Sequence, residues 1–208
     1  MGTLIVTEFM TLDGVGQSPG APDEDREDGF PYGGWQAPLE SSEYDGVVFE
    51  VASRMDALLM GRKTYEIFAD YWPVAPEAIP FTGLFNRVPK YVASSTLDEP
   101  LSWEGTHVLS GDIAESVGTL KERHDEVHLF GSLNLVQSLL AAGLVDRLHL
   151  WQYPIVLGTG KRVFAEGTVP TVMTLSDSKI YGNGLLHLVY EPAGPPTFAR
   201  EDAEYWDQ

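Results

Sequence analysis

The sequence predicts an α/β domain built on a mostly parallel sheet, with helices on both faces and an antiparallel edge on its C-terminal side. Up to Gly143, short apolar segments typical of buried strands alternate with amphipathic helical segments. After Gly143 only strand patterns follow, which indicates antiparallel pairing at one edge. The 208 residues fit one large domain. We expect this domain to span 1–191, followed by a Pro-rich and then acidic tail over 192–208.

The alternating part of the chain supplies most of the expected sheet. Apolar segments predict strands at 2–10, 56–60, 90–93, 107–109 and 127–130. Helical periodicity predicts helices at 41–54, 64–71, 112–124 and 133–142. Ser41 or Ser42 is expected to cap the first helix and Thr64 the second, which Pro73 then ends. Gly143 is the expected C-terminal cap of the last helix.

The C-terminal part contains strand patterns and one clear turn. Strands are predicted at 145–153, 161–164, 172–180 and 185–190. The tripeptide Gly182-Asn183-Gly184 is a good hairpin turn, because Asn and Gly accept positive φ. Near the other end, the Gly-, Pro- and acid-rich segment from Asp13 to Trp35 predicts a long loop, which we expect to cover the substrate side of a site.

The composition excludes several classes of function. Thirteen Lys and Arg against 31 Asp and Glu give a net charge of −18, which repels nucleic acid and anionic membranes, so a small-molecule partner is expected. There is no cysteine, and no pair of histidines has helical metal-ligand spacing, so no metal site is expected. The first apolar run is short and reaches Glu8, so we expect no signal peptide or membrane span and a cytoplasmic protein.

One glycine-rich segment imitates a dinucleotide fingerprint. Gly14 to Gly20 follows a strand, but prolines and acidic residues come next instead of a helix. The fingerprint needs a helix N-terminus to hold the pyrophosphate. We therefore do not expect a Rossmann site there.

Three other strand ends carry glycine or hydroxyl groups. They are Gly61-Arg62-Lys63-Thr64, Ser94-Ser95-Thr96 and Gly131-Ser132-Leu133. Helix N-termini favour anions, and the two cations would add charge against a phosphate. Each segment alone is equally compatible with an ordinary capped helix or a polar turn. Together they predict one crevice for a phosphorylated ligand at the carboxyl ends of the strands.

These segments resemble a known family. In this order, the three strand ends are similar to the cofactor signatures of the dihydrofolate reductase fold. Thr11-Leu12-Asp13-Gly14, and the segment from Pro154 to Gly160 followed by Val163-Phe164, resemble the reductase domain of riboflavin biosynthesis (the RibD C-terminal domain) and its stand-alone relatives. The resemblance covers Leu4 to Tyr190 and implies a three-layer dihydrofolate reductase-like fold.

The resemblance implies NADPH as the cofactor. The cofactor residues that it implies are Leu12, Asp13, Gly14, Gly61, Arg62, Thr64, Ser94, Ser95, Gly131, Ser132 and Leu133. Arg62 and Ser94 would face the 2′-phosphate, Thr64 and Gly131 would flank the pyrophosphate, and the segment 12–14 would border the nicotinamide. The protein would supply orientation and electrostatics for a hydride that the cofactor carries.

The chain departs from the family pattern at two positions. Ser132 stands where the family has the second glycine of a pair, and its hydroxyl can cap the following helix. Val88 stands where folate enzymes carry an arginine for the substrate glutamate, so folate is not the expected substrate. The riboflavin enzyme is often fused to a zinc deaminase domain, and we do not expect one here.

Two further residues are candidates for the substrate side. Asp45 lies sixteen residues before Gly61, where dihydrofolate reductases carry an acid, and would be the proton donor. The alternative, which the many acids around it favour, is an ordinary solvated carboxylate. Trp35 follows the long loop and is a candidate for stacking on a flat ring, or else a core aromatic.

The expected function is therefore an NADPH-dependent reductase acting on a small heterocyclic or carbonyl substrate, of pterin, pyrimidine or flavin type. Two alternatives stay open: a non-catalytic NADPH-binding protein, and an interaction domain without a nucleotide. A homodimer is expected, because the strand segments 144–153 and 154–164 offer apolar surface.

Overall fold

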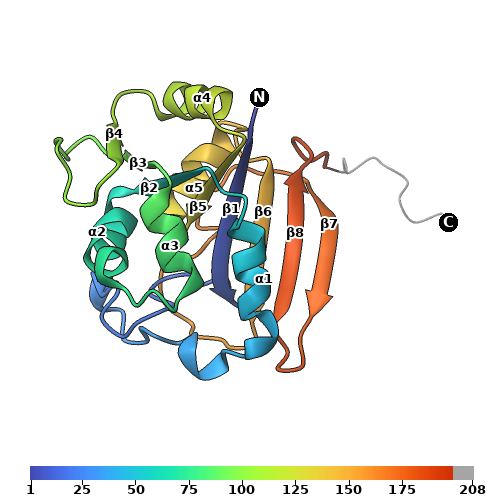
Figure 1. Cartoon of the computed structure of the whole chain (residues 1–208). Helices are drawn as coiled ribbons and strands as arrows, with labels where there is room; N and C mark the ends of the chain where they lie inside the picture. Colours follow the sequence, from blue (N-terminus) through green and yellow to red (C-terminus); the bar gives the residue numbers. More distant parts are fainter. Residues whose placement is uncertain (199–208) are drawn as a thin grey trace.

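The computed structural model describes residues 1–198, except the side chain of Asp45, and places an eight-stranded sheet between two layers of helices (Figure 1). The strands are β1 (Thr3–Thr11), β2 (Ala57–Gly61), β3 (Lys90–Ala93), β4 (Thr106–Leu109), β5 (Glu126–Phe130), β6 (Arg147–Tyr153), β7 (Met173–Ile180) and β8 (Leu186–Pro192). The helices are α1 (Ser42–Ala52), α2 (Arg62–Tyr71), α3 (Pro80–Arg87), α4 (Ile113–Arg123) and α5 (Leu133–Ala141), with short 3-10 turns at Glu27–Gly29, Ala37–Leu39 and Trp72–Val74.

The strand order is β4-β3-β2-β5-β1-β6-β8-β7. The first six strands of the chain pair in parallel, β8 is antiparallel to β6, and β7 is antiparallel to β8. The predicted α/β class with an antiparallel C-terminal edge is confirmed. Because the parallel strands share one direction, their carboxyl ends all meet at the same edge of the sheet.

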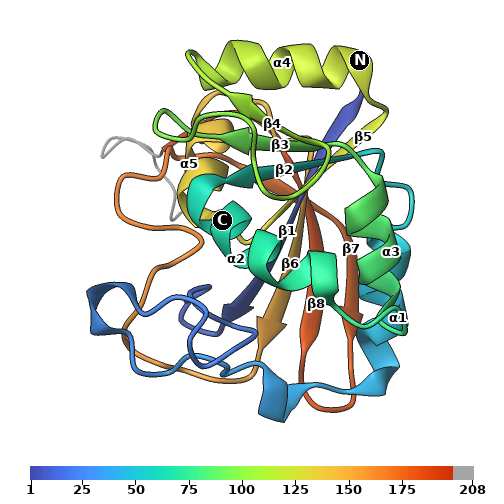
Figure 2. The same cartoon turned by 60° about the vertical axis from the view of Figure 1, so that its left-hand side comes forward.

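The two faces of the sheet are buried under different helices (Figure 2). Leu4 and Val6 on β1 pack with Leu129 on β5 against α4 and α5. On the other face, Leu58 and Met60 of β2 pack with residues of α1, α2 and α3. This alternation follows from the strand period of two, and a parallel strand buried on both faces is apolar throughout.

The long loop and the helix starts differ in part from expectation. No α-helix follows Gly14 to Gly20, which confirms that this segment lacks the Rossmann context. The predicted cap Ser41 is confirmed, since its side chain accepts from the Glu43 N–H. Thr64 as a cap was wrong: α2 begins two residues earlier, with Gly61 at the N-cap position and no side-chain cap. The N-terminal amides of α2 therefore stay available to a ligand.

Two elements were predicted wrongly from the pattern. The segment 161–164 is not a strand, and forms only an isolated bridge between Arg162 and Val15, because its backbone pairs with the long loop. The helix α3 was not predicted; Pro80 occupies its first turn, where the missing N–H costs nothing. Part of the predicted tail, 199–208, lies outside the described residues. Within 1–198 no helix is long and apolar enough to cross a membrane.

Candidate functional site

A pocket of about 720 Å³ opens at the carboxyl ends of β2, β3 and β5. Most of the cofactor residues that the resemblance implies line it: Gly61, Arg62, Thr64, Ser94, Ser95, Gly131, Ser132 and Leu133. Its volume lies within the usual range of roughly 300–1,000 Å³ for small-molecule sites. The three strand ends therefore meet in one crevice, as the sequence predicts.

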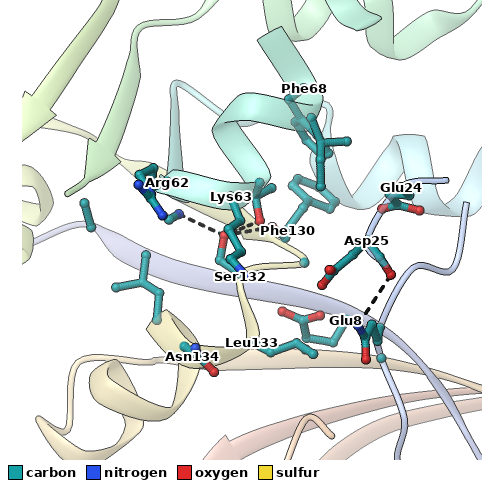
Figure 3. A pocket seen from close by; sticks show the side chains of 18 of the residues that line it. Glu8, Glu24, Asp25, Arg62, Lys63, Phe68, Phe130, Ser132, Leu133 and Asn134 are labelled. Carbon is teal, nitrogen blue, oxygen red and sulfur yellow. Dashed lines mark hydrogen bonds between the residues drawn. The ribbon is translucent and has the colours of Figure 1, made fainter. Parts of the chain in front are cut away.

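Ser132 joins two of these strand ends. Its Oγ accepts a hydrogen bond from the Gly61 N–H at 2.9 Å and donates to the Thr64 Oγ1 at 2.9 Å. Ser132 occupies the N-cap position of α5, but its side chain makes no cap hydrogen bond there. The expectation that its hydroxyl caps α5 was wrong, because the hydroxyl turns to the β2–α2 junction instead (Figure 3).

Replacing Ser132 by Ala should destabilise the protein by about 1 kcal/mol, because the Gly61 N–H loses its partner in a partly buried position. Urea unfolding measures this change. Thr64→Val is the matched control, since it removes the second hydrogen bond and leaves the Gly61 N–H bonded. A loss as large in Thr64→Val as in Ser132→Ala would show that the Gly61 contact is not the important one.

The polar end of the pocket has the chemistry of an anion site. The Arg62 guanidinium is half-exposed, 3.4 Å from the Thr96 hydroxyl and 3.8 Å from the Glu66 carboxylate. Ser94 and Ser95 line the wall beside it. Both α2 and α5 begin here without a side-chain cap, so amides at both helix N-termini can bind phosphate oxygens. Gly131 has φ of 65°, and a Cβ on it would meet no atom within 4 Å, so the backbone is open to a close ligand.

The other end of the pocket is aromatic. Its wall consists of Phe68, Trp72, Phe81, Phe85 and Phe130. Phe85 is central to this wall, with ring centroids 4.8 Å from Trp72 and 5.6 Å from Phe130. Such a surface suits a flat, uncharged ring. Phe81 and Phe85 escaped the sequence analysis because they lie on the unpredicted helix α3.

Glu8 is a carboxylate that sequence reasoning did not place in the site. It lies in the middle of β1, is 1% exposed, and forms part of the pocket wall. Burial raises the pKa of Glu8 to about 8, against the opposing effect of a hydrogen bond from the Gly131 N–H. Its other oxygen, Oε1, has no hydrogen-bond partner. The available signal was a single acid within the apolar segment 2–10.

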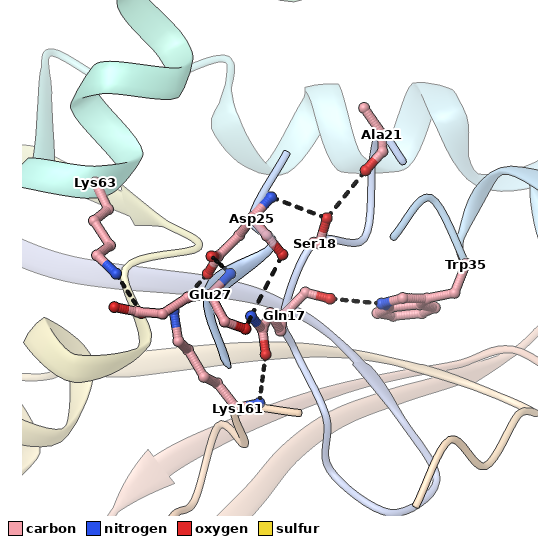
Figure 4. Close-up of polar contacts among 8 residues, drawn as sticks. All are labelled: Gln17, Ser18, Ala21, Asp25, Glu27, Trp35, Lys63 and Lys161. Atoms are coloured by element: carbon pink, nitrogen blue, oxygen red, sulfur yellow. Dashed lines mark hydrogen bonds and ion pairs between the residues drawn. The ribbon is translucent and has the colours of Figure 1, made fainter. Parts of the chain in front are cut away.

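The long loop is tied to the pocket by Lys161 (Figure 4). The Lys161 ammonium lies 2.5 Å from the Asp25 carboxylate and also pairs with Glu27, which in turn pairs with Lys63 of α2. Gln17 adds backbone ties: its Oε1 accepts from the Lys161 N–H at 3.0 Å and its Nε2 donates to the Glu27 carbonyl at 3.2 Å. Lys63 and Lys161, which both line the pocket, thus hold the loop against the pocket wall.

Hydrogen bonds and charge from Lys161 and Lys63 lower the pKa of Glu27 to about 2. A lowered folded-state pKa means that these ion pairs are intact above the ordinary Glu range near 4.5 and are lost as pH falls toward 2. Lys161→Met should speed amide hydrogen exchange in 17–35 several-fold at pH 7, whereas the wild type should loosen only below about pH 4.5. Lys179→Met, with the same charge change on β7, is the control. If amide hydrogen exchange in 17–35 is equally slow in Lys161→Met and Lys179→Met, Lys161 does not hold the loop.

The structure does not bring all predicted residues to the pocket. Leu12, Asp13 and Gly14 lie outside the pocket lining. The Leu12 side chain is exposed. The Asp13 carboxylate accepts hydrogen bonds from the Thr11 hydroxyl and from the backbone N–H groups of Leu157 and Gly158. Asp13 thus organises a turn, and contact of this segment with a nicotinamide stays a prediction.

Trp35 is buried in the core instead of lining the pocket, and donates from its indole Nε1 to the Gln17 carbonyl at 2.8 Å. Asp45 belongs to α1, but its side chain lies outside the described part of the structure, so its role as proton donor stays a prediction. Among the described residues, no group of three or more His, Asp or Glu side chains is arranged to hold a metal ion.

Comparison with known proteins identifies the family of this chain. The family model of the RibD C-terminal domain matches residues 2–187. A Bacillus subtilis strain 168 protein, described as uncharacterized protein YyaP, is 27% identical over 142 residues, which are 66% of this chain and 74% of that protein.

Solved structures show the same fold at lower identity. A putative riboflavin biosynthesis protein from Shewanella sp. PV-4 has a TM-score of 0.71 and 21% identity, over 92% of this chain and 99% of that one. A pyrimidine reductase-like protein from Corynebacterium diphtheriae has a TM-score of 0.65 and 15% identity, over 92% of each chain.

A diaminohydroxyphosphoribosylaminopyrimidine deaminase/5-amino-6-(5-phosphoribosylamino)uracil reductase from Thermotoga maritima has a TM-score of 0.60 and 16% identity, over 92% of this chain but 57% of that one. At these identities the structures establish the fold. Together with the family match, they show that this chain belongs to the RibD C-terminal domain family and has its dihydrofolate reductase-like fold.

Proposed function

We propose that the chain is an NADPH-dependent reductase that transfers a hydride to a small, flat heterocyclic or carbonyl substrate. The observation that carries this proposal is one pocket with two chemically different ends. Its polar end joins Arg62 to the N-termini of α2 and α5, and its other end is the aromatic wall around Phe85. RibD reductases generally use NADPH, which agrees with a pocket that has a polar end for phosphates and an aromatic end for a flat substrate.

The residues present fit a phosphorylated dinucleotide. Arg62 and Ser94 would hold the 2′-phosphate, and the amides at Gly131 and at the start of α2 would hold the pyrophosphate. When bound, NADPH supplies a hydride, and the aromatic wall excludes water from the place where the substrate lies.

Fluorescence titration with NADPH tests the cofactor. Binding with a dissociation constant below about 0.1 mM corresponds to more than about 5 kcal/mol and needs a formed site. Absence of binding at millimolar NADPH would reject the proposal in favour of an interaction domain.

Turnover is the second test. NADPH oxidation, followed by absorbance with pterins, pyrimidines, flavins and quinones, is expected with at least one class of acceptor. Firm binding without oxidation by any of them would favour the alternative, a non-catalytic NADPH-binding protein.

A further inference from the structure

Glu8 lies at a gap in the sheet. The β1–β5 register pairs Thr7 with Phe130, the last residue of β5, so Glu8 is the first residue of β1 beyond the end of its neighbour. On its other side β1 stays paired, with Glu8 opposite Leu150 of β6. The chain turns into α5 at Gly131, and this turn leaves the Glu8 side chain facing the pocket (Figure 3).

The surroundings of this carboxyl differ from those of a structural acid. Within the described residues no ion pair involves Glu8, one oxygen accepts from the Gly131 N–H, and Oε1 is buried without a partner. A buried polar atom without a partner is costly unless something binds it. Because Oε1 belongs to a group in a ligand-sized pocket, a ligand atom is the natural partner.

Most of the other charged side chains in the pocket wall already have hydrogen-bond or ion-pair partners. The remaining charged residues that line it are Glu24, Asp25, Arg62, Lys63 and Lys161. Asp25 and Lys161 pair with each other, Lys63 pairs with Glu27, and the Glu24 carboxylate accepts from the Gly20 and Ala21 N–H groups. Glu8 is therefore the acid in the described pocket wall that has a buried oxygen without a hydrogen-bond partner.

We propose that Glu8 is the proton donor of the reaction, acting on an uncharged C=N or C=O substrate that lies against the aromatic wall. This inference rests on the proposed reductase function. The Glu8 O–H bond breaks and its proton goes to the substrate nitrogen or oxygen, while hydride from NADPH adds to the carbon. The substrate is reduced by two electrons and gains two hydrogens, NADPH is oxidised, and the Glu8 carboxylate regains a proton from water.

The protonation state follows from the environment. With its pKa raised to about 8, Glu8 is mostly protonated at neutral pH and can donate. Above pH 8 it becomes a carboxylate and donation stops. A carboxylate beside the nicotinamide would also attract the positive charge of NADP⁺, which NADPH lacks.

The first experiment measures the affinities of NADP⁺ and NADPH from pH 6 to 9.5 in the wild type and in Glu8→Gln. In the wild type, NADP⁺ affinity relative to NADPH should rise about tenfold through pH 8, and in Glu8→Gln the ratio should stay flat. Glu191→Gln, at an exposed carboxylate of β8 outside the pocket, should behave as the wild type. A flat ratio in the wild type, or a rise that persists in Glu8→Gln, overturns the proposal.

The second experiment follows turnover with any acceptor found above. Glu8→Gln should lose about 10²- to 10⁴-fold in kcat, together with the fall of activity above pH 8, and keep NADPH affinity within about threefold. Loss of NADPH affinity with kcat intact, or loss of the pH break in Asp45→Asn instead, overturns the assignment. Wild-type protein that binds no NADPH would reject the reductase itself. If Glu8→Gln fails to fold, carbon-13 NMR of the glutamate carboxyls in the wild type tests the proposal instead. If none of these carboxyls titrates above pH 7, the proposal is overturned.

Discussion

Arg62→Ala should weaken NADPH binding about 10- to 100-fold and leave NADH binding nearly unchanged. The guanidinium lines the polar end of the pocket beside Ser94, and its ion pair with Glu66 is long, at 3.8 Å, and exposed. Such a pair holds the side chain weakly, so a phosphate can take it over. Charge-assisted hydrogen bonds contribute roughly 1.5–3 kcal/mol each, which gives the expected range.

Lys63→Ala is the matched control for this measurement. It removes the same charge from the neighbouring position, but Lys63 already pairs with Glu27 of the long loop. Titrations at one fixed ionic strength are needed, because salt screens exposed charges. Equal weakening of NADPH and NADH in Arg62→Ala, or equal selectivity changes in both variants, would remove Arg62 from the 2′-phosphate site.

Phe85→Ala should lower the free energy of unfolding by about 3–5 kcal/mol, and hence Tm by roughly 6–20 °C. Phe85 is 2% exposed and its ring lies 5.7 Å from Phe68, 4.8 Å from Trp72 and 5.1 Å from Phe81. Removing the ring leaves a cavity that the surrounding rings cannot fill. Urea unfolding and a thermal melt check both values.

The same variant separates the two ends of the pocket. Because Phe85 belongs to the aromatic wall and not to the polar end, folded Phe85→Ala should keep NADPH affinity within a few-fold and lose substrate affinity. Phe85→Leu keeps most of the volume and should cost far less stability. A loss below about 1 kcal/mol in Phe85→Ala would mean that the wall collapses readily and does not shape a substrate site.

The amino-acid sequence by itself determined the fold class and the polar end of the site. Strand and helix periods are local, so the alternation before Gly143 predicts the parallel sheet. In such a sheet the carboxyl ends of the strands share one edge, and glycine and hydroxyl residues directly after β2, β3 and β5 must lie near one another. Arg62 and Gly131 were predictable for this reason.

Only the tertiary structure decided the rest of the site. Glu8 lines the pocket only because β1 runs past the end of β5, from which it is separated by more than a hundred residues. The Ser132 hydroxyl bonds Gly61 across 71 positions, and Lys161 holds Asp25 across 136. Contacts between distant segments depend on strand order, register and loop packing. Local propensity carries no information about these long-range contacts, because the sequence pattern of a segment does not depend on its neighbours in the fold.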